Sequence, residues 1–452
     1  MRAGFALGLM AAGLVGAVTP ALARPVLLVS VDGLRPGDVL DAQARGLRVP
    51  NLRALLAEGS HAKGVTGILP TNTLPSHVSL VTGVSPARHG VYNNQTFSAQ
   101  NAGGGPSYGF ASGIRVPTLW DAAHAKGIGT ASLNWPVTLG SPGIDRNISV
   151  YFAPPGAASD GESYNRLLSS PALIARIEKA IGPVTLTPRH NVAEEEQDLK
   201  IAQQLLKDGK PGLLTVHFSA LDEAQHKYGL GSGEAKTALE GIDGYIGRLV
   251  ATARQVQPET VIAIVSDHGF TPVKTEVNLP RAFVDAGLIR FDAKGGVASW
   301  DAAPWPAGGS AAILLARPDD AALKARVAAL LDRLKADPAV GIEEVYGADE
   351  LARRGGFPGA SFGISYRLDT TGPSAPRPIS QPLVSPAVQK ATHGHAASHP
   401  ELQSAFIIAG PGIAKARDLG FIDLRAIAPT LANVLGVALP DAEAPALSIQ
   451  TR

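Results

Sequence analysis

Six aspartate and histidine residues are spaced along the chain at positions where they could bind metal ions. They are Asp32, Asp222, His226, Asp267, His268 and His393. Asp222 and His226 are four residues apart, so one helical turn would place both side chains on the same side of a helix. Asp267 and His268 directly follow the β-branched run 261–265, and polar residues at a strand end commonly project into a crevice. Each pair alone also arises by chance, so the metal site depends on the whole set.

The stretch Leu69–Asn94 supplies hydroxyl groups that could react at such a site. It reads LPTNTLPSHVSLVTGVSPARHGVYNN, and its run 77–81 predicts a helix whose N-terminus carries a hydroxyl group. Free N–H groups and the helix dipole stabilise a phosphate or sulfate there, although helix capping is the structural alternative. Two metal ions could lower the pKa of a nucleophile and neutralise charge on a leaving oxygen. Thr73 is then the candidate nucleophile.

Carboxylates and imidazoles without a thiolate define which metals fit. The chain contains no Cys, so thiolate sites and disulfides are excluded. The six ligands suit Zn²⁺, and they suit Mg²⁺ or Mn²⁺ less well.

Apolar strands separated by helices must bring these ligands together. Strands are predicted at 24–32, 211–218 and 261–265, and each is followed by a potential ligand. Helices are predicted at 192–207 and 234–255 from apolar residues at helical spacing. This alternation predicts a mostly parallel sheet with the site along its C-terminal edge.

The remaining segments predict a second, smaller unit. Residues 281–366 combine a strand, an amphipathic helix and a further strand, which we interpret as an inserted α/β subdomain. Residues 24–280 and 367–452 would then form the catalytic core. Four further expectations concern shorter segments: a helix at 116–126, a Gly/Ser-rich loop at 103–113, an irregular surface or substrate-facing segment at 132–157, and a closing strand and helix at 405–409 and 423–435.

Charge and the N-terminal residues bear on location and partners. Lys+Arg 40 against Asp+Glu 39 gives a net charge of +1, so no nucleic-acid-binding surface is evident. Residues 1–23 carry Arg2, an apolar run and Ala21-Leu22-Ala23, which together predict a cleaved signal peptide and export to the periplasm or the medium. A membrane anchor is the alternative, but the apolar run is short for a bilayer span. No later stretch predicts a membrane span, and nothing indicates an oligomeric state.

Five ordered motifs resemble one known family. VSVDG, PTNTLPSHVSLVTGVSPARHGVYNN, LDEAQHKYG, IVSDHG and THGH resemble the type I phosphodiesterase/nucleotide pyrophosphatase family of the alkaline phosphatase superfamily. The likeness runs from about Val26 to the segment 428–436 and is weakest over 281–366. The resemblance implies an alkaline-phosphatase-like three-layer α/β sandwich with a mostly parallel central sheet and a smaller inserted subdomain.

The same resemblance implies a chemistry and a set of residue roles. It implies a hydrolase of phosphodiester or pyrophosphate bonds with two Zn²⁺, other divalent ions being alternatives. One ion would be held by Asp222, His226 and His393, and the other by Asp32, Asp267, His268 and Thr73. Thr73 would form a phospho-threonine intermediate that water hydrolyses. Asn94 and the Thr73 N–H would donate to a phosphate oxygen of a small-molecule phosphate ester.

Three departures from the family pattern affect the substrate pocket. Leu74 stands where nucleotide-cleaving members commonly carry an aromatic residue, Ser76 stands where Asn is usual, and Trp135-Pro136-Val137 replaces a Trp-Pro-Gly element. Base stacking by the residue after the nucleophile is therefore lost. A non-nucleotide diester or a phosphonate ester is an alternative substrate.

Other functions remain open from the sequence. An alkaline phosphomonoesterase would need extra cations, for which Lys126, Arg146 and Arg166 are candidates. A sulfatase is disfavoured because there is no Cys and no Ser-x-Pro-x-Arg element at the nucleophile. A non-catalytic, metal-stabilised binding protein of the cell envelope is least favoured, because all of the ligands are retained.

Overall fold

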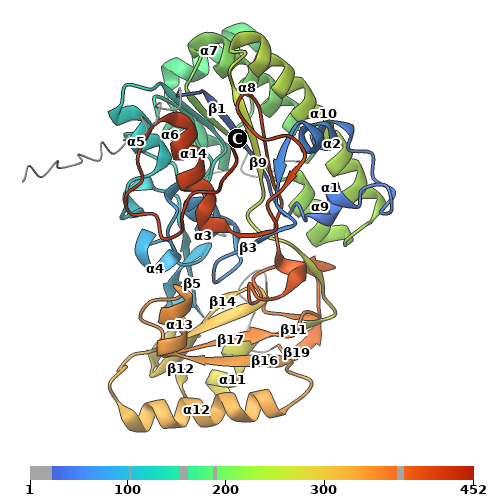
Figure 1. Cartoon of the computed structure of the whole chain (residues 1–452). Helices are drawn as coiled ribbons and strands as arrows, with labels where there is room; N and C mark the ends of the chain where they lie inside the picture. The colour runs from blue at the N-terminus through green and yellow to red at the C-terminus, as the bar shows by residue number, and fades with distance from the viewer. Residues whose placement is uncertain (1–22, 102, 152–160, 187–190, 374–380, 452) are drawn as a thin grey trace, which may run out of the picture.

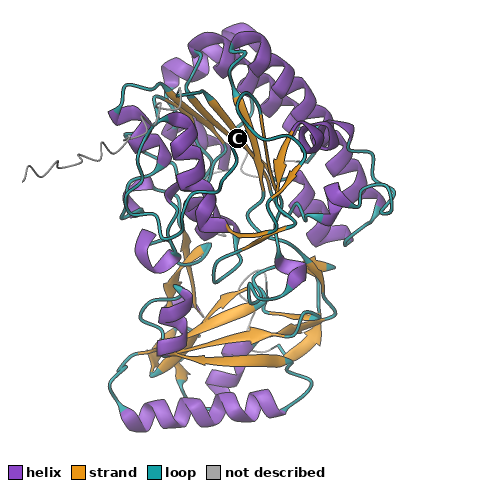
Figure 2. Ribbon diagram, viewed as in Figure 1, coloured by secondary structure: helices purple, strands orange, loops and turns teal. Residues whose placement is uncertain are grey.

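An eight-stranded sheet forms the centre of the larger part of the molecule (Figures 1 and 2). The computed structural model describes residues 23–101, 103–151, 161–186, 191–373 and 381–451. The strands, in spatial order, are β22 (Arg417–Asp418), β2 (Gly59–His61), β21 (Phe406–Ala409), β9 (Val261–Val265), β1 (Val26–Val31), β8 (Leu213–Phe218), β6 (Thr130–Leu133) and β7 (Arg146–Ile148).

The central strands of this sheet are parallel. β1 lies between β8 and β9 and pairs in parallel with both, and β6 pairs in parallel with β8 and β7. β21 is antiparallel to β9 and β2. The predicted mostly parallel sheet is confirmed, and its consecutive order β9-β1-β8 places the three ligand-bearing strand ends side by side.

Helices cover both faces of the sheet. Leu27, Val29 and Val31 of β1 pack on the side of α2 (Pro50–Glu58), α8 (Glu195–Gly209) and α10 (Gly233–Val256). Val26 and Leu28 pack on the side of α3 (Thr73–Thr82), α5 (Leu119–Ala125) and α14 (Ile427–Leu435). Successive strand residues point to opposite faces, so a strand buried on both sides must be apolar throughout. The predicted three-layer α/β architecture is confirmed.

A second sheet lies beside the large one, at the bottom of Figure 1. It is antiparallel, with the order β14 (Ala302–Ala307), β15 (Ser310–Leu315), β17 (Phe362–Tyr366) and β16 (Ile342–Gly347). α11 (Leu279–Asp285) and α12 (Ala321–Ala336) pack on it through a separate core that includes Phe283, Val327 and Leu331. In this sheet, β14 is the strand that lies next to the larger part of the molecule (Figure 1).

Two expectations for connecting segments are wrong. The Gly-rich stretch at 103–113 includes β5 (Gly103–Ser107), which pairs with β4 (Gln95–Ser98), because glycines are accepted in a strand whose partner supplies the hydrogen bonds. The segment 132–157 is not simply irregular, since it contains the end of β6 and the whole of β7. Its residues 152–157 lie outside the described part of the chain.

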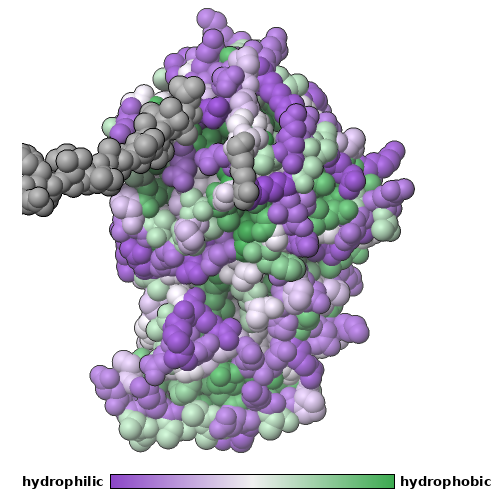
Figure 3. Space-filling model, in the orientation of Figure 1, coloured by the Kyte–Doolittle hydropathy of each residue, from purple (hydrophilic) through white to green (hydrophobic). Residues whose placement is uncertain are grey.

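The surface and the termini add two observations. Hydrophilic and apolar residues are mixed across the face shown in Figure 3. Within the described ranges, every helix is too short or too polar to cross a bilayer. The predicted signal peptide falls almost entirely on residues 1–22, which are outside those ranges.

Candidate active site

Three ligands gather at the carboxyl ends of β1 and β9, and we name them the strand group: Asp32, Asp267 and His268. Asp32 directly follows β1, and Asp267 and His268 follow the last residue of β9 by two and three positions. Parallel pairing of the two strands therefore fixes their separation. His268 Nε2 lies 3.1 Å from Asp267 Oδ2 and 3.4 Å from Asp32 Oδ1.

Three further ligands lie beside the strand group, and we name them the helix–loop group: Asp222, His226 and His393. Asp222 and His226 are one turn apart on α9 (Ala220–Tyr228), and His226 Nε2 is 3.4 Å from Asp222 Oδ1. His393 follows β20 (Ala391–Thr392), and its Nε2 is 3.9 Å from Asp222 Oδ1. The His393 ring stacks on the His268 ring at 3.6 Å, so the two groups form one continuous cluster.

Thr73 and Asn94 complete the site. Thr73 is the first residue of α3, and its Oγ1 is 3.3 Å from His268 Nε2. The Leu74 N–H donates to Asn94 Oδ1 at 2.9 Å, which leaves the Asn94 Nδ2 amide free to donate elsewhere. The Thr73 N–H has no acceptor in the described part of the chain. The structure thus brings together all eight residues singled out from the sequence.

The donor set of this cluster fits divalent cations. Asp32 Oδ1, Asp222 Oδ1 and Asp267 Oδ2 are buried and receive no hydrogen bond within the described residues. Unpaired buried carboxylate oxygens are costly unless a cation compensates them. Two groups of three ligands each lie within 4.8 Å: Asp32, Asp267 and His268, and Asp222, His268 and His393. His268 is a member of both of these sets of three, although it was assigned above to the strand group alone.

The histidine rings are oriented by backbone carbonyls. The Nδ1 atom of each ring has a carbonyl partner: Ala391 O at 2.9 Å for His226, Thr71 O at 3.0 Å for His393 and Gly269 O at 3.2 Å for His268. A ring that donates through Nδ1 keeps its lone pair on Nε2, the usual arrangement for a metal ligand.

Burial and mutual repulsion shift the pKa values of the carboxylates. Burial, and the charges of Asp267 and Asp222, raise the pKa of Asp32 well above its usual value. Burial also raises the pKa of Asp222. Burial opposes ionisation of Asp267 as well, but the neighbouring His268 lowers the pKa of Asp267 well below its usual value. Burial and the charges of His268 and His226 lower the pKa of His393. Cations would relieve this concentration of acids.

Two histidines outside the predicted set of ligands support the strand group. His217 Nε2 is 3.1 Å from Asp32 Oδ2. His77 donates from Nδ1 to the Thr73 carbonyl at 2.8 Å, and its Nε2 contacts Ser30 Oγ at 2.8 Å. Burial lowers the pKa of His77. His217 is the only ionisable residue of β8, and that exception to an apolar strand was the available signal.

Glu195 supports the helix–loop group from a distance. Its side chain is fully buried, and its Oε1 accepts hydrogen bonds from the Ser219 and Ala220 N–H groups at the start of α9. The N-cap residue Ser219 makes no side-chain capping bond itself. The sequence indicated only an acidic helix start at 194–196. Glu195 instead caps the helix that carries Asp222.

Two side chains near the nucleophile are buried rather than open to substrate. Leu74 is 3% exposed and packs with Val78, Val91 and Val137. Trp135 is fully buried and contacts His77 edge-on at 5.0 Å. The expectation that the segment around Trp135 faces solvent or substrate is therefore wrong for this residue, which instead stabilises His77.

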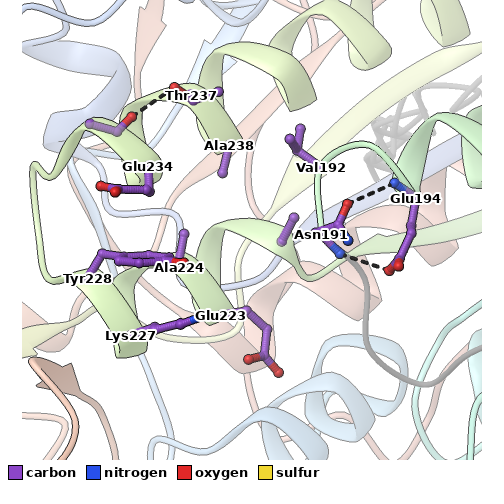
Figure 4. Close-up of a pocket in the computed structure, with 12 residues that line it drawn as sticks. Asn191, Val192, Glu194, Glu223, Ala224, Lys227, Tyr228, Glu234, Thr237 and Ala238 are labelled. Atoms are coloured by element: carbon purple, nitrogen blue, oxygen red, sulfur yellow. Dashed lines mark hydrogen bonds between the residues drawn. The ribbon is translucent and has the colours of Figure 1, made fainter.

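A cavity of about 800 Å³ lies on the other side of α9 (Figure 4). Ala220, Ala224 and Tyr228 line it from α9, and Thr237 and Ala238 line it from α10. At 100° per residue, these α9 positions face away from Asp222 and His226. This cavity is therefore separated from the metal ligands by the helix that carries them.

Comparisons with known proteins identify a family model and several relatives that match this chain. Residues 26–358 match the family model described as type I phosphodiesterase / nucleotide pyrophosphatase. Human ectonucleotide pyrophosphatase/phosphodiesterase family member 1 is 26% identical over 257 residues, which cover 54% of this chain and 23% of the relative. Venom phosphodiesterase 2 of Crotalus adamanteus is 25% identical over 261 residues, which cover 56% of this chain and 27% of the relative. The matched region is thus about a quarter of the length of these relatives.

Solved structures of similar proteins share the fold. Human ectonucleotide pyrophosphatase/phosphodiesterase 5 has a TM-score of 0.63 and 17% identity, with 94% of this chain and 97% of that chain covered. An inactive Thr-to-Ala variant of the murine counterpart, in complex with AMP, gives the same TM-score and identity, with 94% and 97% covered. At this identity the likeness shows the fold, which is that of the alkaline-phosphatase-like sandwich.

Proposed function

Because the chain belongs to the type I phosphodiesterase/nucleotide pyrophosphatase family, we propose that it is a metal-dependent hydrolase of phosphodiester or pyrophosphate bonds. The observation that carries this proposal is the convergence of Thr73 and Asn94 on the strand and helix–loop groups at the C-terminal edge of the sheet. Ligands of open α/β sheets bind at this edge. The relatives named above are themselves called phosphodiesterases and pyrophosphatases.

We propose that two Zn²⁺ are the resident ions, with one bound by Asp222, His226 and His393. The strand group and Thr73 Oγ1 would bind the other. Such ions lower the pKa of a nucleophile and neutralise charge on the transferred group. His268 lies within reach of Asp222 and His393 as well as of Asp32 and Asp267, so its ring would be a ligand next to both ions.

We propose that the transfer takes place in two steps. In the first step, Thr73 Oγ1 loses its proton to solvent and forms a bond to phosphorus, while the bond from phosphorus to the leaving oxygen breaks and that oxygen takes a proton from solvent. In the second step, a water oxygen bonds to phosphorus, and Thr73 Oγ1 leaves and regains its proton. The Asn94 Nδ2 amide and the Thr73 N–H donate to a non-bridging phosphate oxygen in both steps, which stabilises the charge that develops there. A Thr-to-Ala variant of murine ectonucleotide pyrophosphatase/phosphodiesterase 5 is inactive.

Several contacts favour a diester over a monoester. A monoester carries a second negative charge that requires further cations near Thr73. Arg166 is paired with Glu178 and Glu162, and the Arg146 guanidinium lies against Gly209 at the end of α8. Lys126, the third candidate cation, lies at the end of α5. Among the described residues, none of these three cations forms a hydrogen bond or ion pair with Thr73 or with a proposed metal ligand.

The residues of the site select the phosphate group more narrowly than they select the leaving group. Leu74 is buried and offers no aromatic surface, so a nucleotide would have to be held by other residues. A non-nucleotide diester or a phosphonate ester fits the same phosphate-binding residues. We further propose that the protein is exported and acts in the periplasm or outside the cell, as a chain preceded by a signal peptide at 1–23 would.

A substrate comparison with purified protein tests the proposal. We expect about two Zn²⁺ per chain and a higher kcat/KM for bis(p-nitrophenyl) phosphate than for p-nitrophenyl phosphate. A panel of dinucleotides, NAD, glycerophosphodiesters and phosphonate esters would then identify the leaving group. A preference for the monoester would favour a phosphomonoesterase. Zinc binding without turnover of any ester would favour a non-catalytic binding protein.

A further inference from the structure

Asn93 occupies the centre of a buried hydrogen-bond network beside the active site. It is 2% exposed. Its Oδ1 accepts from the Asn94 N–H at 2.8 Å and from Asn72 Nδ2 at 2.8 Å. Its Nδ2 donates to the Pro306 carbonyl of β14 at 2.8 Å. The amide group therefore uses its oxygen twice and its nitrogen once, which fixes its orientation without ambiguity between O and N.

One arm of this network leads to the phosphate-binding residue. The Asn94 side chain has to point its Nδ2 towards the phosphate while its Oδ1 receives the Leu74 N–H. The Asn94 carbonyl is held separately, by Ser107 Oγ at 3.0 Å and the Tyr108 N–H at 3.2 Å. Asn93 holds the remaining backbone group of Asn94, its N–H. Loss of this bond would leave the backbone of Asn94 restrained on one side only.

The other arm leads to a metal ligand. Asn72 donates to Asn93 through Nδ2, and its Oδ1 lies 3.1 Å from His393 Nδ1. Because His393 Nδ1 carries the donated proton, Asn72 helps to keep the lone pair of His393 on Nε2, which faces Asp222. Two adjoining amides, Asn93 and Asn72, thus join the residue that would bind phosphate to a ligand of the helix–loop group.

The anchor of the network is the hairpin formed by β14 and β15. In addition to the Pro306 carbonyl, the Gly309 N–H of this hairpin donates to the His393 carbonyl at 2.8 Å. The fit is close, because a Cβ on Gly394 would lie 2.0 Å from the Ala307 carbonyl oxygen, and a Cβ on Gly308 would lie 2.6 Å from the His393 carbonyl oxygen. The second sheet therefore reaches the site at two points.

We propose that Asn93 is a positioning residue that fixes Asn94 and, through Asn72, His393 against the β14–β15 hairpin. The second sheet then serves as a support that holds the phosphate-binding and metal-binding sides of the site at a set distance. Residues that orient ligands in this way typically change affinity or activity by about 10- to 100-fold when removed. This inference rests on the proposed phosphodiesterase function for the role of Asn94, but not for the orientation of His393.

A double-mutant cycle tests the first arm. Asn93→Ala, Asn94→Ala and the double variant are compared for kcat and KM with bis(p-nitrophenyl) phosphate. At saturating Zn²⁺, where a weaker metal site through His393 does not limit turnover, we expect Asn93→Ala to lower kcat/KM by about 10- to 100-fold. If Asn93 acts through Asn94, the double variant should then be no worse than Asn94→Ala alone. Additive losses, or an Asn93→Ala enzyme within about twofold of the wild type, would overturn the inference.

A zinc titration tests the second arm without using turnover. By calorimetry of metal-free protein, Asn93→Ala and Asn72→Ala should both weaken the Zn²⁺ site that includes His393, and the two losses should not add. Unchanged zinc affinity in both variants would overturn this arm. If the wild type fails to hydrolyse any ester, the proposed function fails, but the titration still decides whether Asn93 orients His393.

Asn165 provides a matched control for loss of a buried amide. It is fully buried, its Oδ1 accepts from the Tyr151 N–H, and its Nδ2 donates to the Leu186 carbonyl at 3.1 Å. Asn165→Ala should lower the thermal midpoint as Asn93→Ala does, with kcat/KM and zinc affinity unchanged. If Asn93→Ala does not fold, Asn93→Ser takes its place in both experiments. An equal loss of kcat/KM in Asn165→Ala would show that general destabilisation explains the effect.

Discussion

The strand group and the helix–loop group hold chemically similar ligands in different ways. Asp32, Asp267 and His268 extend from two adjacent parallel strands whose ladder pairs Val26 with Val261 through Ser30 with Val265. The side chains of Asp267 and His268 are fully buried. The position of this group is set by the central sheet, whose strands β1, β8 and β9 are buried along their whole length.

The helix–loop group depends on more distant support. α9 has nine residues, and Glu195 of α8 caps its first N–H groups. His393 lies on a loop held by Thr71 and by Gly309 of the second sheet. The side chains of Asp222 and His226 retain 14% and 17% exposure. The helix–loop group therefore depends on more separate elements than the strand group does before its ligands are in place to bind a metal ion.

Replacement of the nucleophile should give the largest loss of activity and the smallest loss of zinc from the strand group and the helix–loop group. Thr73→Ala removes the atom that attacks phosphorus, so we expect kcat for bis(p-nitrophenyl) phosphate to fall by at least about a thousandfold. Three ligands of the strand group and three of the helix–loop group remain, so zinc content by elemental analysis should stay close to that of the wild type. A fully active variant would place the nucleophile elsewhere. Loss of zinc would show that Thr73 contributes more to binding than its neighbours do.

The same comparison explains what could be predicted from the sequence. The strand group was predictable because Asp32 and Asp267 end runs of apolar residues, and parallel strands bring such ends together. Asp222 and His226 were predictable from helical spacing. Thr73 was predictable as a hydroxyl at a helix start that two ions could activate. Asn94 came from a family resemblance, since no spacing rule joins residues that are 21 apart in different elements.

The contacts of the supporting residues could not be predicted because their partners are distant in sequence. Glu195 is 24 residues from Ser219, and an acidic residue at a helix start is already explained by the helix dipole. Asn93 meets Pro306 across 213 residues. The strand β5 was missed because a Gly-rich strand has little intrinsic preference and depends on its partner β4. Each of these depends on tertiary contacts that a local pattern does not contain.

Removal of the remote cap should separate the two groups. Glu195→Ala leaves the Ser219 and Ala220 N–H groups without their acceptor, at a cost of about 1–2 kcal/mol in the free energy of unfolding. Because α9 carries Asp222 and His226, we also expect the Zn²⁺ affinity of the helix–loop group to fall by about tenfold. The strand group should bind Zn²⁺ as before. Calorimetric titration of metal-free protein would resolve the two sites.

Asp243 offers a closely matched control for this experiment. It is a buried carboxylate on α10 that accepts from the Asn51 and Leu52 N–H groups at the start of α2. α2 carries none of the ligands of either group. Asp243→Ala should therefore destabilise the protein to a similar extent without changing zinc affinity, and Glu195→Gln, which keeps an acceptor oxygen, should restore affinity. Equal losses of zinc affinity in the two alanine variants would remove the distinction between remote and local support.

The smallest expected effect is a dependence of zinc-induced stabilisation on pH. Burial raises the pKa of Asp32 and of Asp222 above the ordinary value of about 3.9. A raised pKa means that the folded, metal-free protein binds these protons more tightly than the unfolded chain does, so its stability falls as the pH rises through the raised pKa values. Bound Zn²⁺ requires the ionised carboxylates and neutral imidazoles and removes this loss.

Zinc should therefore raise the thermal midpoint more at about pH 8 than at about pH 5.5, at fixed protein and metal concentrations. In Asp222→Asn, the zinc-induced shift should be smaller at both pH values, because the helix–loop group loses its carboxylate. Its increase with pH should persist, because Asp32 of the strand group still titrates. If that increase disappears, Asp222 alone is responsible for the pH dependence. The free-energy cost of ionising the ligands would then come from Asp222 of the helix–loop group, and Asp32 of the strand group would not contribute to it.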